Sequence, residues 1–134
     1  MKKFSNRFLI VVGLLALLSV VTGCNTVSVN ANQYVGAPQF PPSNPADIQI
    51  LREQPSRPSI QLGEVRAEPS NDGVSVQKIE EALRNAAAKL GADAVVITAD
   101  RTEVVGAFVS GPWFGRQLQP IQGRVVVGIA IKYK

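Results

Sequence analysis

The chain has 134 residues, of which 14 are Lys or Arg, 10 are Asp or Glu and none is His. Lys2, Lys3 and Arg7 lie within the first seven residues, and without them 11 basic residues face 10 acidic ones, so the charge balance gives no support for nucleic-acid binding. With no His and a single Cys, the chain lacks an imidazole base, a Cys-His nucleophile pair and an ordinary zinc or haem ligand set. We therefore expect neither an enzyme nor a bound cofactor.

The chain begins with a basic segment, which leads into an apolar run over residues 8–21. A run of this length with charged residues before it is typical of a secretory signal peptide, because a membrane span needs about 18 or more apolar residues. The sequence that follows is Val21-Thr22-Gly23-Cys24. It resembles the bacterial lipobox, in which an aliphatic residue and two small residues precede an acylated cysteine.

The lipobox resemblance implies a signal peptide over residues 1–23, recognition by a signal peptidase through Val21, Thr22 and Gly23, and lipidation of Cys24. Two or three acyl chains hold a protein stably on a bilayer, whereas one chain holds it only reversibly. The alternatives are a cleaved signal with an incidental cysteine, an uncleaved anchor, or a thiol that is free or forms an intermolecular disulfide. In Gram-negative lipoproteins Asp after the cysteine favours the inner membrane, so Asn25 predicts the periplasmic face of the outer membrane.

The segment 24–45 is rich in Asn and Pro and contains only two aromatic residues, Tyr34 and Phe40. Such a composition buries little apolar surface, and clustered prolines favour extended backbone. We therefore predict a tether that spaces the domain from the membrane. In the alternative, residues 34–40 dock on a partner or back on the domain.

The remaining residues, 46–134, are enough for one small domain. Its clearest element is a helix that begins after Ser75, a suitable N-cap, and ends at Gly91. Apolar residues recur at helical spacing along one face of it: Val76, Ile79, Leu83, Ala86, Ala87 and Leu90.

Strands are predicted over residues 47–51, 60–67, 94–98 and 124–134. The order ββαββ predicts an α+β fold with a mixed four-stranded sheet and the helix on one face. The second strand, the helix and the third strand make a crossover, and the last strand returns antiparallel. In the last strand we expect the larger side chains to face the core: Val125, Val127, Ile129, Ile131 and Tyr133.

The connection over residues 100–123 is unusually long and is predicted to be a hairpin tip, with residues 102–108 extending the third strand. Trp113 and Phe114 lie among glycines and a proline, next to Arg116. Exposed aromatic residues beside an arginine are typical of interfaces, so these three residues are the predicted partner contact. In the alternative, the two rings fold over the end of a small core.

The stretch 79–97, which contains the run Leu90-Gly91-Ala92-Asp93-Ala94-Val95-Val96, resembles the helix-to-strand motif of YbjQ-like domains and of the stress-sensing lipoprotein of the Rcs pathway. The Rcs sensor is held by disulfides that this chain lacks. The resemblance implies a lipid-anchored envelope protein with a non-catalytic binding or structural domain and an unidentified envelope protein partner. The alternative is an envelope sensor or an oligomeric small-ligand-binding domain.

Overall fold

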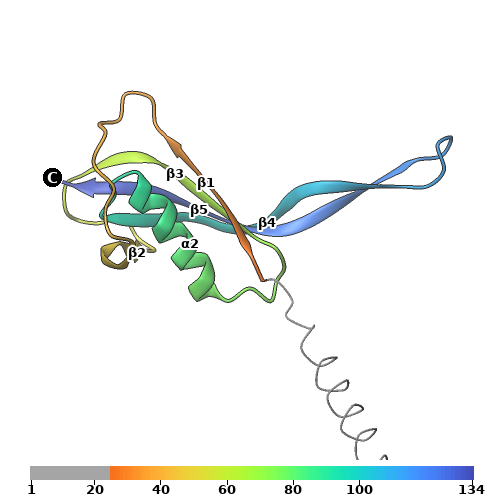
Figure 1. Cartoon of the computed structure of the whole chain (residues 1–134), viewed down its shortest axis with the longest axis horizontal. Coiled ribbons are helices and arrows are strands. Elements are labelled where there is room, and N and C mark those ends of the chain that lie inside the picture. The colour runs from red at the N-terminus through yellow and green to blue at the C-terminus, as the bar shows by residue number, and fades with distance from the viewer. Residues whose placement is uncertain (1–24) are drawn as a thin grey trace, which may run out of the picture.

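A computed structural model describes residues 25–134, so the predicted signal peptide, its recognition residues Val21, Thr22 and Gly23, and the lipidation site Cys24 lie outside the described part. The described elements are β1 (Val27–Gln33), the short 3-10 turn η2 (Pro45–Asp47), β2 (Gln49–Leu51), β3 (Ser59–Pro69), α2 (Val76–Lys89), β4 (Ala94–Ser110) and β5 (Gln117–Tyr133). The strands form one sheet in the order β1-β3-β5-β4-β2, with α2 packed on one face (Figure 1). The α+β class is confirmed, but the sheet has five strands and not four.

The helix begins and ends where the sequence predicts. The hydroxyl oxygen of Ser75 accepts a hydrogen bond from the Lys78 backbone N–H at 3.4 Å, which satisfies one of the free donors of the first turn. Gly91 follows the helix with a φ of 74°, and a Cβ at this position would lie 2.6 Å from the Cβ of Phe40. Ile79 and Leu83 are buried against the sheet. Gly91 therefore provides both the left-handed turn and the room for Phe40 to pack.

The directions of the strands joined by the crossover are as predicted. β3 and β4 each pair antiparallel with β5, which lies between them, so β3 and β4 are parallel and α2 connects them. Of the two edge strands, β2 falls within the predicted strand 47–51, and β1 is the additional one. β2 pairs parallel with the start of β4 at one edge, and β1 pairs antiparallel with β3 at the other.

The prediction of a tether over residues 24–45 needs correction, because β1 lies within this segment and is part of the sheet. Val27 and Val29 pack against the core, and their neighbours in the strand alternate with them toward the other face. Farther along, Phe40 also packs against the core, and the Ser43 hydroxyl donates to the Ala92 carbonyl at 2.6 Å. This part of the chain thus docks back on the domain, as the alternative reading of residues 34–40 expects.

The prediction for the two faces of β5 is wrong. Val126 and Ala130 belong to the core beneath α2, whereas the bulkier series that includes Val125 and Ile131 lies on the open face of the sheet. The side chains of the neighbouring strand leave room only for small residues on the helix side of β5: a Cβ at Gly128 would lie 2.5 Å from Cγ1 of Val95 on β4. The core volume there comes instead from fully buried side chains of β3 and α2, among them Leu62, Val65 and Leu83.

Candidate functional site: a projecting hairpin

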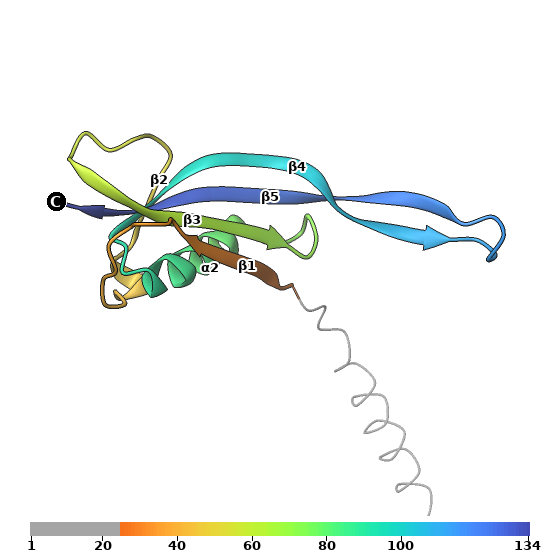
Figure 2. The same cartoon turned by 90° about the horizontal axis from the view of Figure 1, so that it is seen from above.

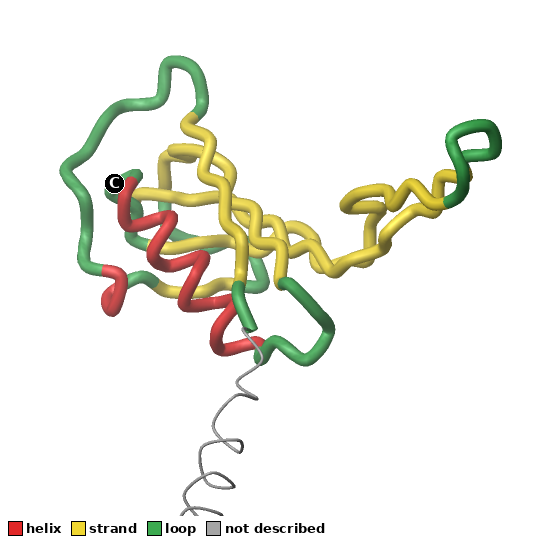
Figure 3. The backbone as a smooth tube through the Cα atoms, turned by 45° about the vertical axis from the view of Figure 1, so that its right-hand side comes forward, coloured by secondary structure: helices red, strands yellow, loops and turns green. Residues whose placement is uncertain are grey.

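β4 and β5 continue as a two-stranded ribbon beyond the rest of the sheet. On the outer side of β4, β2 pairs only as far as Val96, and on the outer side of β5, pairing with β3 ends at Val126. The two strands nevertheless stay paired with each other to Ser110 and Gln117. Figures 2 and 3 show this ribbon reaching well beyond the body of the domain. We call residues 104–123 the projecting hairpin.

The tip of the projecting hairpin is a tight turn that displays two aromatic rings. Gly111 has a φ of 100°, and the Gly115 N–H donates to the Pro112 carbonyl at 2.9 Å. Between them, Trp113 and Phe114 are 83% and 75% exposed, with ring centroids 5.6 Å apart in an edge-to-face arrangement. Of the two alternatives that the sequence leaves open, the one in which the rings fold over the core is wrong, and their role as a partner contact stays a prediction.

The shaft of the hairpin is also apolar, which the sequence reasoning missed. Six of its large side chains are between 40% and 73% exposed: Val104, Val105, Phe108, Val109, Leu118 and Ile121. Residues 104–123 contain no acidic residue, and their only charge is Arg116, which is exposed. This near-absence of charge over 20 residues was the signal that could have identified the whole hairpin.

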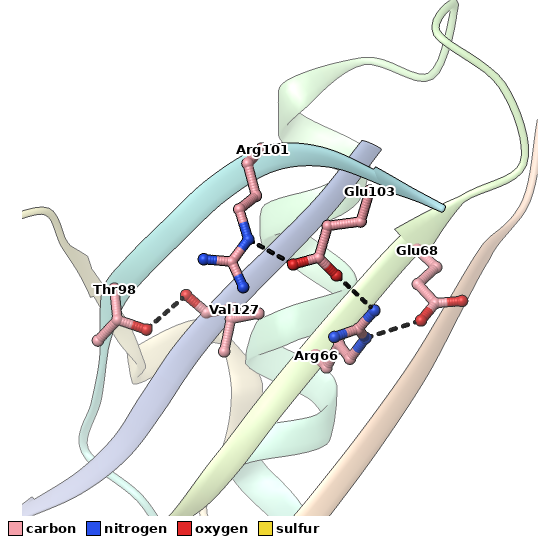
Figure 4. A network of polar contacts seen from close by, with 6 residues as sticks. All are labelled: Arg66, Glu68, Thr98, Arg101, Glu103 and Val127. Atoms are coloured by element: carbon pink, nitrogen blue, oxygen red, sulfur yellow. Dashed lines mark hydrogen bonds and ion pairs between the residues drawn. The ribbon is translucent and has the colours of Figure 1, made fainter. Parts of the chain in front are cut away.

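On the open face of the sheet, a charged network crosses the base of the hairpin (Figure 4). Arg66 of β3 donates from Nη2 to Glu103 of β4 at 3.0 Å and from Nε to Glu68 at 2.8 Å, and Arg101 donates to the other Glu103 oxygen. Hydrogen bonds from Arg101 and then Arg66 lower the pKa of Glu103. Val125 of β5, the strand between β3 and β4, is completely buried.

The helix-side face of the base carries a second ion pair. Arg124 donates from Nε and Nη2 to the two carboxylate oxygens of Asp100, at 2.8 and 2.7 Å. This bidentate contact lowers the pKa of Asp100 chiefly through its hydrogen bonds. The Asp100–Arg124 pair thus joins the two strands of the hairpin at its base, and the Arg66–Glu103 pair on the other face joins this base to β3.

The start of the described chain is fixed at the same end of the sheet as the hairpin. The Asn25 carbonyl accepts from Lys78 Nζ at 2.9 Å, and its side-chain oxygen accepts from Asn71 at 3.1 Å. In the sheet, Val27 pairs with Pro69, just beyond the last residue of β3 that pairs with β5. The residue that follows the predicted lipidation site is therefore held beside the place where the hairpin leaves the body.

Other chemistry is sparse in residues 25–134. A cavity between α2 and the sheet, lined by residues that include Ile79, Leu83 and Val126, has a volume of about 20 Å³, roughly the space of one water molecule. Two open surface grooves are larger, at about 510 Å³ each: one lies between β1 and α2, and the other lies between residues 50–57 and Tyr133. No cluster of His, Cys, Asp and Glu in the described residues could hold a metal ion. No helix in this range is long and apolar enough to cross a bilayer.

Comparison with known proteins adds little to this description. No protein-family model matches the chain, and no curated protein matches it. Among solved structures, the crystal structure of a Francisella virulence factor, FvfA, aligns with 78% of this chain and 97% of its own, at 16% identity and a TM-score of 0.47. A likeness of this strength carries no functional argument, and the resemblance to YbjQ-like domains stays a prediction.

Proposed function

We propose that this chain is a lipid-anchored lipoprotein of the cell envelope, whose domain acts without catalysis by binding through the projecting hairpin. The observation that carries the proposal is the display of Trp113 and Phe114, 83% and 75% exposed, at the end of a ribbon that leaves the domain. Large aromatic side chains are costly to leave in water and are the residues that dominate binding energy when they are buried in a contact. Their exposure on a protruding turn favours a role in contact over a role in stability.

The base of the hairpin supports the same interpretation. Glu103 and Asp100 are ion-paired on opposite faces of the ribbon, with Arg66 and Arg124 respectively. A contact surface that is already ordered loses less conformational freedom on binding than a flexible loop does. The ion pairs thus order the base from which the ribbon carries the aromatic tip.

The lipid anchor is proposed from the lipobox-like residues that end at Cys24, with the outer-membrane periplasmic face as the location in a Gram-negative cell. The contacts of Asn25 with Lys78 and Asn71 leave no flexible spacer between that position and the domain. If Cys24 is acylated, the domain is held directly at the bilayer surface. The cavity under α2, at about 20 Å³, is far below the roughly 300–1,000 Å³ of a small-molecule site, but two open surface grooves of about 510 Å³ each lie within that range, so ligand binding stays the second candidate function.

The anchor is tested by metabolic labelling with palmitate in cells that express the wild-type chain or Cys24→Ser. We expect label in the wild type and none in the variant, because the thiol is the proposed acylation site. Fractionation of the envelope then locates the protein. An unlabelled wild type would refute the anchor, and separation with inner-membrane markers would refute the outer-membrane location.

The contact role is tested in the same cells by placing a photoreactive residue at Phe114 or, as a control, at Lys89. Both positions are exposed, but Lys89 lies on α2 in the body of the domain. We expect crosslinked products from position 114 well above those from position 89. Equal yields at the two positions would show that the hairpin is not a preferred contact surface.

A further inference from the structure

We propose that the tip of the projecting hairpin inserts into the interfacial layer of the same bilayer that holds the acylated Cys24. The partner of Trp113 and Phe114 is then the lipid surface itself. This inference rests on the proposed function and names the partner of its contact surface. It follows from the chemistry of the tip, from the backbone of the ribbon and from the position of Asn25.

The chemistry of the tip matches the headgroup region of a membrane. Tryptophan is enriched there because its ring is apolar and its N–H still finds a hydrogen-bond acceptor. Arg116 is the only charged residue in the projecting hairpin, and no acidic residue accompanies it. A single cationic group beside exposed aromatic rings suits a surface that contains anionic lipids.

The backbone of the ribbon limits the depth of insertion. Beyond Val96, β4 has no strand on its outer side among the described residues, and β5 has none before Val126. Unpaired backbone donors and acceptors cannot enter the hydrocarbon core, where no water satisfies them. The turn around Pro112 and Gly115, by contrast, is small and carries its own hydrogen bond at 2.9 Å. Insertion is therefore confined to the tip, at the level of the headgroups.

The position of the chain start brings the tip to the membrane. Asn25 is held next to the start of β1, and Figures 1 and 2 show that the start of β1 and the hairpin both lie away from the C-terminus of the domain. From Val104 to Ser110 the ribbon reaches about 20 Å, at about 3.4 Å per residue. An anchored domain that leans on the bilayer thus places the tip on its surface. Because the anchor makes this contact intramolecular, even weak insertion is populated.

The sequence supplies a probe for the experiment, since Trp113 is the only tryptophan in the chain. The full-length protein, purified with its anchor, is reconstituted into vesicles of phosphatidylcholine and phosphatidylglycerol, and tryptophan fluorescence is measured with and without brominated lipids. A matched control combines Trp113→Phe with Tyr34→Trp, which moves the probe to a partly exposed site beyond the far end of β1. We expect emission from Trp113 to shift to the blue and to be quenched at least twofold, while the control changes little.

The outcomes separate this inference from the function on which it rests. Mass spectrometry of the N-terminal peptide reports acylation of Cys24 independently of fluorescence. An acylated protein whose Trp113 is unquenched, or is quenched no more than the control, overturns the membrane insertion and leaves the anchor intact. Crosslinks from position 114 in cells that go only to protein, and not to lipid, overturn it as well. An N-terminus without acyl chains overturns the proposed function and this inference together.

Discussion

β4 and β5 run through both the body of the domain and the projecting hairpin, but their apolar side chains are buried in the first region and exposed in the second. In the body, Val95 of β4 and Val125 of β5 are completely buried. In the hairpin, Phe108 of β4 and Leu118 of β5 are 59% and 73% exposed. The difference is that in the body α2 covers one face and β3 and β2 flank the two strands, whereas the described residues place nothing over the hairpin. Apolar residues thus stabilise the fold in one region and are available for contact in the other.

The largest expected effect on stability is from Leu83→Ala, which removes a core side chain from the body of the domain. Leu83 is completely buried in the core between α2 and the sheet, so its truncation should lower the free energy of unfolding by about 2–5 kcal/mol. Leu118→Ala is the matched control in the hairpin, where the change should stay within about 0.5 kcal/mol. Urea unfolding followed by circular dichroism measures both. Similar losses for the two variants would contradict the division into body and hairpin.

A second prediction concerns glycines in the same two strands. Gly128→Ala should lower the free energy of unfolding by about 1–3 kcal/mol, because the new Cβ would lie 2.5 Å from Cγ1 of Val95 and 3.2 Å from the Val96 carbonyl oxygen. In the hairpin, Gly106→Ala meets nothing closer than Ile121 Cδ1 at 3.9 Å. It should therefore be neutral or slightly stabilising. Thermal melts of the two variants compare them directly, and a well-tolerated Gly128→Ala would show that the strands are less tightly packed than described.

A smaller effect is expected from the ion pairs that join the two regions. The folded pKa values of Asp100 and Glu103 are lowered by their arginine partners. Their stabilisation is present above the unfolded pKa values of about 4 and is lost as the pH falls through the lower folded values. Between about pH 5 and pH 2, we expect the melting temperature of the wild type to fall further than that of the double variant Asp100→Asn/Glu103→Gln. Parallel pH profiles for the two proteins would mean that the pairs do not stabilise the base.

The body was largely predictable because its signals are local. Ser75 and Gly91 mark the ends of α2, and the apolar period between them identifies its buried face. β1 was missed because the Asn-rich and Pro-rich composition of residues 25–45 hid the short alternation of Val27 and Val29. The assignment of the β5 faces failed for another reason. Side-chain size alone does not reveal that the helix side of the sheet requires Gly128, which depends on tertiary packing.

The hairpin was predicted in its place, whereas the exposure of its tip was left open and its length and apolar shaft were missed. The pairing of β4 with β5 shifts register between Ile97 and Ala99 and again between Val104 and Gly106. Each such irregularity changes which side chains share a face, so a simple period of two does not run through the strand. Whether Trp113 packs on the core also depends on how far the ribbon projects, which no local pattern encodes.

The smallest effect on stability should come from the tip, where the effect on contact should be greatest. Trp113→Ala and Phe114→Ala each remove a ring that is at least 75% exposed, so the free energy of unfolding should change by less than about 0.5 kcal/mol. Loss of either ring should nevertheless weaken lipid contact, which is read as crosslinking of the tip to lipid from a photoreactive residue at Leu118. Ile79→Ala, in the core, provides the reverse control, because it should destabilise the fold while leaving the tip chemistry unchanged. A large fall in melting temperature for Trp113→Ala would place the tryptophan in the stabilising part of the fold and remove the basis for treating the hairpin as a contact surface.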